Sequence, residues 1–148
     1  MLEARAKVLR LSPVYRTAPM YVLNQPDFLN GAALLETDLG PRSLLATLKE
    51  IEDRMGREKS ARYGPREIDL DLVAFGCLSY QYVGGERDLT VPHPKLAERR
   101  FVLAPSYDVA PDWHFPGLGD VRSLLARTES DADAVLKLND AAIHLQGN

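Results

Sequence analysis

The feature that most constrains this chain is the stretch of residues 57–76, whose second half alternates between apolar and acidic side chains. In an extended segment, successive side chains point to opposite faces. One face would carry Ile68, Leu70, Leu72 and Ala74. The other face would carry Glu67, Asp69 and Asp71. The alternation predicts a strand with one buried face, from which two aspartates point the same way.

Aspartates two positions apart on a strand lie roughly 6 to 7 Å apart, close enough to hold one or two hard cations. Magnesium is usually held by one or two carboxylates, while substrate phosphates and water complete its octahedron. Four cationic residues precede the strand, in a stretch with Gly64 and Pro65 that we expect to be a loop and not regular helix. They are Arg57, Lys59, Arg62 and Arg66. The pattern predicts a site for magnesium and a polyphosphate.

Each half of this pattern also has a purely structural interpretation. Two aspartates on a strand more often form only the solvated face of an amphipathic strand, and cationic loops often serve only solubility. The adjacency of the two features, with residues 63–66 fixing the turn between them, favours the functional interpretation. Aspartate also has a poor strand propensity, so two of them in one short strand need a reason.

Composition narrows the class of protein. At 148 residues with 45% apolar side chains, residues 1–148 are expected to form one domain, with a polar tail over residues 128–148. The single cysteine, Cys77, excludes an internal disulfide and a cysteine-based zinc site and suits a reducing cytosol. With a net charge of −3 and neither a long apolar run nor a signal-peptide pattern, we expect a cytoplasmic protein without nucleic-acid or membrane partners.

The first part of the chain predicts a helix end followed by strands. Residues 1–9 have helix-forming composition and no start signal, so we expect the last turns of a helix. Residues 11–17 predict a strand, which Pro13 makes an edge or bulged one. Residues 28–37 are nearly continuously apolar and predict a strand buried on both faces.

The middle of the chain predicts one clear helix and one hairpin. Pro41 suits the first helical position, apolar residues follow at helical spacing, and Gly56 is expected to end the helix. Residues 77–88 predict a hairpin or loop, and residues 89–94 an extended segment because of their two prolines.

The last part predicts shorter elements. Residues 95–100 predict one helical turn, and residues 101–105 an apolar segment that its proline ends. Trp113 is expected to cover the edge of the core, and Asp120 to cap a short helix. Residues 134–138 predict at most a short strand or helix. The order of elements predicts an α+β fold with a mainly antiparallel sheet.

Several motifs together carry a resemblance to a known family. They are VYRTAP at 14–19, QPDFLN at 25–30, GPREIDLDL at 64–72, and VPHP at 91–94 followed by ERRF at 98–101. With these motifs in this order from about residue 9 to residue 117, the chain resembles the 6-hydroxymethyl-7,8-dihydropterin pyrophosphokinase family of folate biosynthesis.

The resemblance implies a ferredoxin-like α+β sandwich and an enzyme that transfers the terminal pyrophosphoryl group of ATP to the hydroxymethyl oxygen of a reduced pterin, releasing AMP. It implies two magnesium ions held by Asp69 and Asp71, which with Arg57 and Arg66 would be the catalytic residues. Around ATP it implies Glu52, Arg57, Lys59, Arg66, Ile68, Thr90 and His93. Around the pterin it implies Thr17, Ala18, Phe28, Asn30, Tyr63, Arg99 and Phe101.

Some of these residues also allow other interpretations. The aromatic residues are about as consistent with the core, His93 would by default be an exposed loop histidine, and Glu52 a solvent-facing helical residue. Asn30 is more informative, because an unpaired amide in an apolar strand would cost roughly 1 to 3 kcal/mol. The chain departs from the family pattern at Ala18, Phe28, Tyr63 and Pro94. These departures affect details of the contacts with pterin and ATP and not the class of reaction.

The resemblance also concerns the start of the chain. Family members begin with a strand, a Gly-Ser-Asn turn and a long helix before the point where Met1 stands, so it implies an N-terminally incomplete chain. For such a chain we expect weak stability, or an oligomer in place of a family-like monomer, and low activity. The alternatives are a magnesium-dependent nucleotidyltransferase and an inactive remnant that only binds a nucleotide or a partner.

Overall fold

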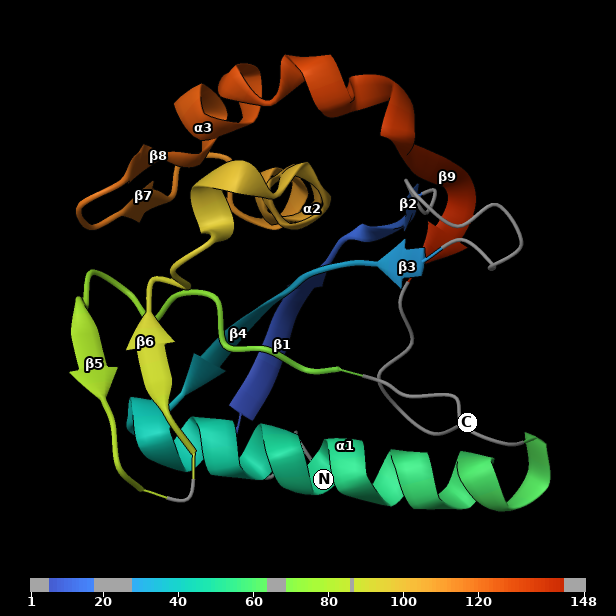
Figure 1. Ribbon diagram of the computed structural model, residues 1–148, viewed down its shortest axis with the longest axis vertical. Helices are drawn as coiled ribbons and strands as arrows, with labels where there is room; N and C mark the ends of the chain where they lie inside the picture. The colour runs from blue at the N-terminus through green and yellow to red at the C-terminus, as the bar shows by residue number, and fades with distance from the viewer. Residues whose placement is uncertain (1–5, 18–27, 64–68, 86, 143–148) are drawn as a thin grey trace.

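The computed structural model of the protein describes residues 6–17, 28–63, 69–85 and 87–142, with the backbone alone at 57–63, 133 and 139–142 (Figure 1). The strands are β1 (Ala6–Leu11), β2 (Pro13–Thr17), β3 (Phe28–Asn30), β4 (Ala33–Thr37), β5 (Tyr80–Tyr82), β6 (Leu89–Val91), β7 (His114–Phe115), β8 (Gly119–Asp120) and β9 (Val135–Ala142). The α-helices are α1 (Pro41–Tyr63), α2 (Arg100–Val109) and α3 (Val121–Arg127). The described residues also form the short 3-10 helices η2 (Leu96–Glu98) and η3 (Glu129–Ala134).

Strand pairing within the described residues is antiparallel throughout. The pairs and sheets are β1 with β4, β2 between β3 and β9, β5 with β6, and β7 with β8. In Figure 1, α1 lies on one side of β1 and β4, while α2 and α3 lie toward the opposite end of the molecule. The predicted α+β class with antiparallel pairing is confirmed.

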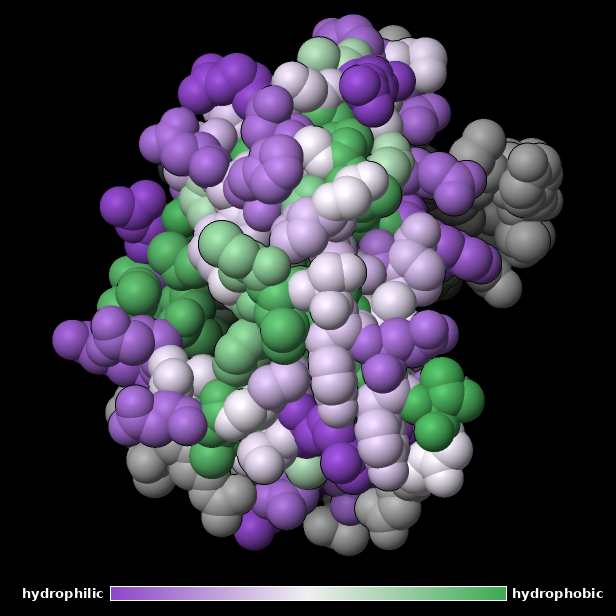
Figure 2. Space-filling view, turned by 90° about the vertical axis from the view of Figure 1, so that its left-hand side faces the viewer, coloured by the Kyte–Doolittle hydropathy of each residue, from purple (hydrophilic) through white to green (hydrophobic). Residues whose placement is uncertain are grey.

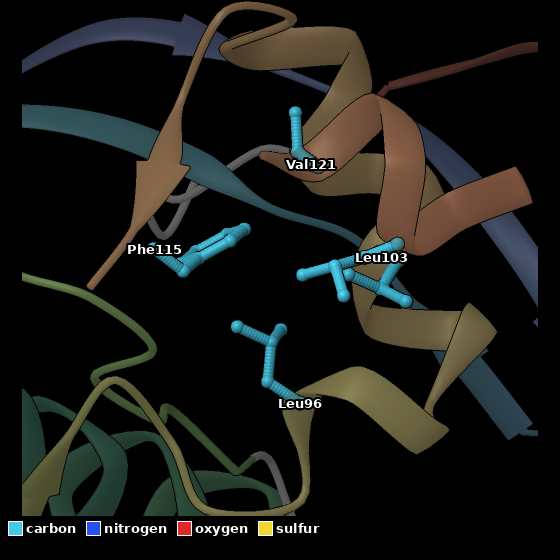
Figure 3. Close-up of a cluster of buried hydrophobic side chains, with 5 residues drawn as sticks. Leu96, Leu103, Phe115 and Val121 are labelled. Atoms are coloured by element: carbon cyan, nitrogen blue, oxygen red, sulfur yellow. The ribbon is translucent and has the colours of Figure 1, made fainter. Parts of the chain in front are cut away.

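Apolar side chains gather in several clusters that join these elements. The largest cluster, shown in Figure 3, comprises Leu96, Leu103, Phe115, Val121 and Leu124. A second cluster packs Ala6 of β1 against Leu44 and Leu48 of α1. Both clusters extend onto the segment at 69–75, because Val73 packs on the first and Leu70 on the second. Residues 69–75, which we call the acidic segment, therefore contact both clusters.

The prediction for residues 1–9 is wrong in its described part. Residues 6–11 form the strand β1, in which Ala6 pairs with Thr37 of β4 and packs on α1. Helix propensity is a weak preference, and burial against a neighbouring strand and helix outweighs it.

The prediction of one doubly buried strand over residues 28–37 is also wrong. The segment divides into β3 and β4, and Phe28 and Leu29 are 56% and 63% exposed. The division coincides with Ser12, which separates β1 from β2. Its backbone N–H donates to Ala32 O at 2.9 Å, and its hydroxyl accepts from Ala32 N at 2.8 Å. These bonds replace the ladder at the point where the chain passes from one sheet to the next.

Helix α1 begins at Pro41 as predicted but continues through Gly56 to Tyr63, so the predicted stop is wrong. Gly56 is not among the glycines with a positive φ and therefore does not adopt the left-handed conformation that ends helices. A glycine inside a helix costs about 1 kcal/mol, which the flanking turns tolerate. In consequence Arg57, Lys59 and Arg62 belong to a helix and not to the predicted loop.

Residues 69–75 form no strand ladder, which corrects the prediction of a regular strand. The segment is attached to the rest of the fold by other hydrogen bonds, among them His93 N to Val73 O at 2.8 Å. The predicted alternation nevertheless holds from Asp69 to Leu72, since Leu70 and Leu72 pack in the core while both aspartates are exposed.

The predictions for the later elements have mixed outcomes. A hairpin is present as predicted, but its second strand, β6, lies beyond residues 77–88, in the segment predicted as extended. Trp113 packs against the largest core cluster. Asp120 caps α3, because its carboxylate accepts a hydrogen bond from Ser123 N at 2.8 Å.

The predicted end of the apolar segment at Pro105 is wrong, since α2 runs through this proline, which is buried in the helix. Within the region predicted as a polar tail, β9 pairs with β2.

Truncation of the central leucine of the largest cluster tests this description of the core. Leu103 is fully buried, so Leu103→Ala should lower the free energy of unfolding by about 2 to 5 kcal/mol through lost burial and a residual cavity. Leu136→Ala, at a side chain that is 44% exposed, should change it by less than about 1 kcal/mol. Urea unfolding followed by circular dichroism measures both. Equal effects of the two substitutions would contradict the packing.

Candidate active site

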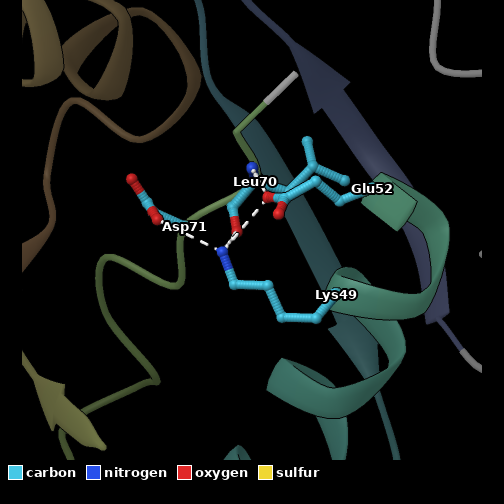
Figure 4. A network of polar contacts seen from close by, with 4 residues as sticks. All are labelled: Lys49, Glu52, Leu70 and Asp71. Carbon is cyan, nitrogen blue, oxygen red and sulfur yellow. Dashed lines mark hydrogen bonds and ion pairs between the residues drawn. The ribbon is translucent and has the colours of Figure 1, made fainter. Parts of the chain in front are cut away.

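Two side chains of α1 hold the residue that separates the two aspartates (Figure 4). Glu52 Oε2 accepts from Leu70 N at 2.6 Å, and Lys49 Nζ donates to Leu70 O at 3.0 Å. Lys49 and Glu52 lie one helical turn apart and form an ion pair at 3.1 Å. Both backbone groups of Leu70 are therefore bonded to one pair of helical side chains, which we call the Leu70 clamp.

The clamp leaves the neighbouring carboxylates facing solvent. The Asp71 side chain is 57% exposed, and Lys49 Nζ lies 3.6 Å from its Oδ1. Asp69 is also exposed. The described residues hold no group of three or more histidine, cysteine, aspartate or glutamate side chains able to bind a metal by themselves. Two carboxylates fit magnesium, whose other ligands are then substrate phosphates and water.

His93 lies near this acidic segment. Its Nδ1 accepts a hydrogen bond from Lys95 N at 3.2 Å, so the proton of the neutral ring is on Nε2. Burial of the ring, followed by the positive charge of Arg99, lowers the pKa of His93, while the Asp71 carboxylate raises it. The ring is thus a neutral donor within the electrostatic reach of Asp71 and Arg99.

A pocket of about 390 Å³ opens beside His93. Its walls come from the hairpin of β5 and β6, the extended segment after it, and the turn between β7 and β8. These strands lie on the side of the molecule that faces the viewer in Figure 2. The lining residues are Ser79, Tyr80, Gln81, Thr90, Val91, Pro92, His93, Pro94, Pro116, Gly117 and Leu118. The two residues that sequence analysis associates with ATP in this region, Thr90 and His93, therefore share one pocket.

A second group of candidate residues gathers where β2 and β3 face the start of α2. Thr17 pairs with Phe28 across the strands, and Asn30 Nδ2 lies at 3.5 Å from Thr17 Oγ1. At this limiting distance the amide is only weakly bonded to Thr17. Arg99 lies over the ring of Phe101 at 5.6 Å from its centroid. Phe101 also packs against a buried cluster of core residues, so it has a structural role in addition to any contact with a ligand.

The structure brings some predicted residues together and does not describe others. Glu52 and Asp71 both contact Lys49, and Asp71 and Arg99 both act on His93. Ala18, Arg66 and Ile68 lie outside the described residues. For Arg57, Lys59 and Tyr63 the structure describes the backbone of α1.

Sequence analysis missed Lys49. The available signal was its position three residues before Glu52 on the same helical face, with the opposite charge. That signal is common on helix surfaces, and only the fold shows that the acidic segment packs there.

Comparison with known proteins decides the family. The profile of the 7,8-dihydro-6-hydroxymethylpterin-pyrophosphokinase (HPPK) family matches residues 1–111. The chain belongs to the HPPK family. The resemblance stated from the motifs is therefore confirmed, and the α+β structure agrees with it.

Individual relatives of this HPPK chain are named for folate synthesis or for a pyrophosphokinase. A "Folate synthesis bifunctional protein, mitochondrial" of Pisum sativum is 46% identical over 109 residues, which are 74% of this chain and 20% of that protein. A "2-amino-4-hydroxy-6-hydroxymethyldihydropteridine pyrophosphokinase" of Synechocystis sp. is 40% identical over 118 residues, 80% of this chain and 58% of that protein. A protein of the same name from Pseudomonas aeruginosa is 41% identical over 120 residues, 81% of this chain and 72% of that protein.

The chain thus spans about a fifth of the Pisum sativum relative and less than two thirds of the Synechocystis one.

Among the described helices, none is both long enough and apolar enough to cross a lipid bilayer.

Titration of His93 tests how the candidate site is arranged. We expect the pKa of His93 to lie below its ordinary value of 6.5, because burial and Arg99 disfavour the charged ring. Asp71→Asn should lower this pKa further, since it removes the carboxylate that favours the charged form. Asp112→Asn, at an exposed turn residue, is the control. NMR titration of the imidazole signals measures the pKa, and a value unaffected by Asp71→Asn would contradict the arrangement.

Proposed function

We propose that this protein is a 6-hydroxymethyl-7,8-dihydropterin pyrophosphokinase, which transfers the terminal pyrophosphoryl group of ATP to the pterin hydroxymethyl oxygen and releases AMP. The observation that carries the proposal is the exposed pair Asp69 and Asp71 on either side of the clamped Leu70, in a chain of the HPPK family. The names of the relatives support the same reaction.

In the proposed site, Asp69 and Asp71 hold the magnesium ions, of which we expect two. When bound, magnesium would neutralise charge on the phosphate oxygens and so favour cleavage of the bond between the α- and β-phosphates of ATP. The Leu70 clamp fixes the backbone between the two carboxylates, so the ligands are oriented before the nucleotide arrives.

Cationic and polar residues would bind the rest of ATP. In the proposed site, Arg57 and Arg66 neutralise the triphosphate together with Lys59, and the Nε2 proton of His93 points to a phosphate oxygen. Phosphoryl-type transfer needs little covalent participation of the protein, so positioning and neutralisation supply most of the catalysis. The other proposed ATP contacts are Glu52, Ile68 and Thr90. The pocket shared by Thr90 and His93 supports this assignment.

The pterin would lie where β2 and β3 face α2. A flat heterocycle needs an apolar or aromatic face and an amide that matches its edge. Phe28 is exposed and Asn30 is only weakly engaged by Thr17, which leaves both available to a ligand. The remaining proposed contacts are Ala18, Tyr63, Arg99 and Phe101.

The proposed reaction conserves atoms and charge as follows. The pterin hydroxymethyl oxygen forms a bond to the β-phosphorus of ATP, the bond from that phosphorus to the oxygen shared with the α-phosphate breaks, and AMP leaves. The hydroxyl proton passes to solvent. We propose that Arg99 contacts both substrates; its effect on the pKa of His93 and its position over the ring of Phe101 support this role.

Substitution of the carboxylates tests the proposal. Asp69→Asn and Asp71→Asn keep the size of the side chain but remove the charge, and each should lower pterin-dependent AMP formation by about 100-fold or more. AMP is measured after incubation with magnesium, ATP and 6-hydroxymethyl-7,8-dihydropterin. Asp112→Asn should retain full activity. Full activity of either site variant, with folding verified by circular dichroism, would exclude the proposed metal site.

Product analysis separates the proposed reaction from the alternatives. With label on the α-phosphate of ATP, we expect the label in free AMP, and with label on the γ-phosphate, in the pterin product. A nucleotidyltransferase would instead attach the α-label to its acceptor and release pyrophosphate. A folded chain that binds ATP and forms neither product would be an inactive remnant. Chromatography of the two labelled reactions distinguishes these outcomes.

A further inference from the structure

Lys49 contacts carboxylates of the candidate metal site in addition to the backbone of Leu70. Its Nζ lies 3.0 Å from Leu70 O, 3.1 Å from Glu52 Oε2 and 3.6 Å from Asp71 Oδ1. The side chain is 21% exposed, so this ammonium group is largely enclosed by its partners (Figure 4). It extends from α1 toward Asp71, whose carboxylate is more than half exposed.

The charges around Asp71 explain why the contact matters. Asp69, Asp71 and Glu52 bring three negative charges to one short region, and Lys49 supplies a positive charge in contact with two of them. His93 and Arg99 lie within electrostatic reach of this region, since Asp71 and Arg99 both act on the pKa of His93. Among the described residues, Lys49 forms an ion pair with the Asp71 carboxylate, at 3.6 Å.

We propose that Lys49 is a positioning residue that serves as an internal counter-charge. It keeps Asp71 in place without metal and lowers the affinity of the Asp69 and Asp71 pair for a free divalent cation, so that the metal binds together with the nucleotide phosphates. This inference rests on the proposed function of the site. Its physical basis is simple, because a fixed ammonium near Asp71 repels an incoming cation, and the nucleotide phosphates offset that repulsion.

The two roles of Lys49 predict opposite effects of its removal. If Lys49 only supported the backbone, its loss would loosen the Leu70 clamp and weaken metal binding. If it acts as a counter-charge, its loss increases the affinity for a free cation, by about 3- to 10-fold for a partly exposed charge pair. The sign of the change therefore separates the two.

The test measures Mn²⁺ binding to the full chain without nucleotide, from the free Mn²⁺ signal in electron paramagnetic resonance. Lys49→Met and Lys49→Gln should bind Mn²⁺ about 3- to 10-fold more tightly than the wild type. Glutamine can still donate a hydrogen bond, which provides a second variant if the methionine variant folds poorly. Lys49→Arg, which keeps the charge, and Lys7→Met, which removes an exposed charge from β1, should match the wild type.

A second measurement adds ATP. The gain in Mn²⁺ affinity that ATP produces, beyond the Mn²⁺ that ATP binds without protein, should be smaller in Lys49→Gln than in the wild type, because the counter-charge that the phosphates overcome is absent. Asp71→Asn should weaken Mn²⁺ binding in every background, which locates the bound ion.

Two results would overturn the inference in distinguishable ways. Equal or weaker Mn²⁺ binding by the neutral variants, in a protein whose wild type forms pterin-dependent AMP, would reject the counter-charge and leave the proposed function standing. Absence of protein-bound Mn²⁺ in the wild type and all variants, with and without ATP, would reject the counter-charge together with the proposed metal site.

Discussion

The Leu70 clamp is the interaction on which the candidate site depends. A backbone segment without ladder partners would be free to turn its side chains either way, yet residues 69–75 have a defined orientation. Glu52 and Lys49 fix the N–H and the C=O of Leu70, while the leucine side chain packs against α1. Since neighbouring side chains of an extended segment point in opposite directions, burying Leu70 exposes the aspartates on both sides of it. One core residue thus orients the acidic site.

Sequence patterns predicted the parts of the fold that depend on local chemistry. The alternation around Leu70, the helix start at Pro41 and the cap at Asp120 each depend on a few neighbouring residues, and each is confirmed. Patterns failed where distant packing decided the outcome. Gly56 resembles a helix stop by composition, but only its backbone conformation in the fold decides whether it acts as one.

The same distinction applies to the site. Asp69 and Asp71 were identified because their spacing is visible in the sequence, and their exposure agrees with that prediction. Lys49 was missed because its importance depends on which segment packs on its helix face. His93 was named only through the family resemblance, since its contact with Val73 and its proximity to Asp71 arise from elements far apart in sequence. The roles of all these residues in binding remain predictions.

The opposite half of the site depends on a different buried polar group. Tyr15 of β2 donates its hydroxyl to Asp108 of α2, and Lys137 of β9 forms an ion pair with the same carboxylate at 3.3 Å. Burial, followed by the bond to Asp108, raises the pKa of Tyr15, so the hydroxyl remains a donor. Asp108 therefore ties α2 to two strands of the sheet that carries Thr17 and Asn30. In both halves an acidic side chain of a helix holds the segment beside it: Glu52 holds Leu70, and Asp108 holds Tyr15.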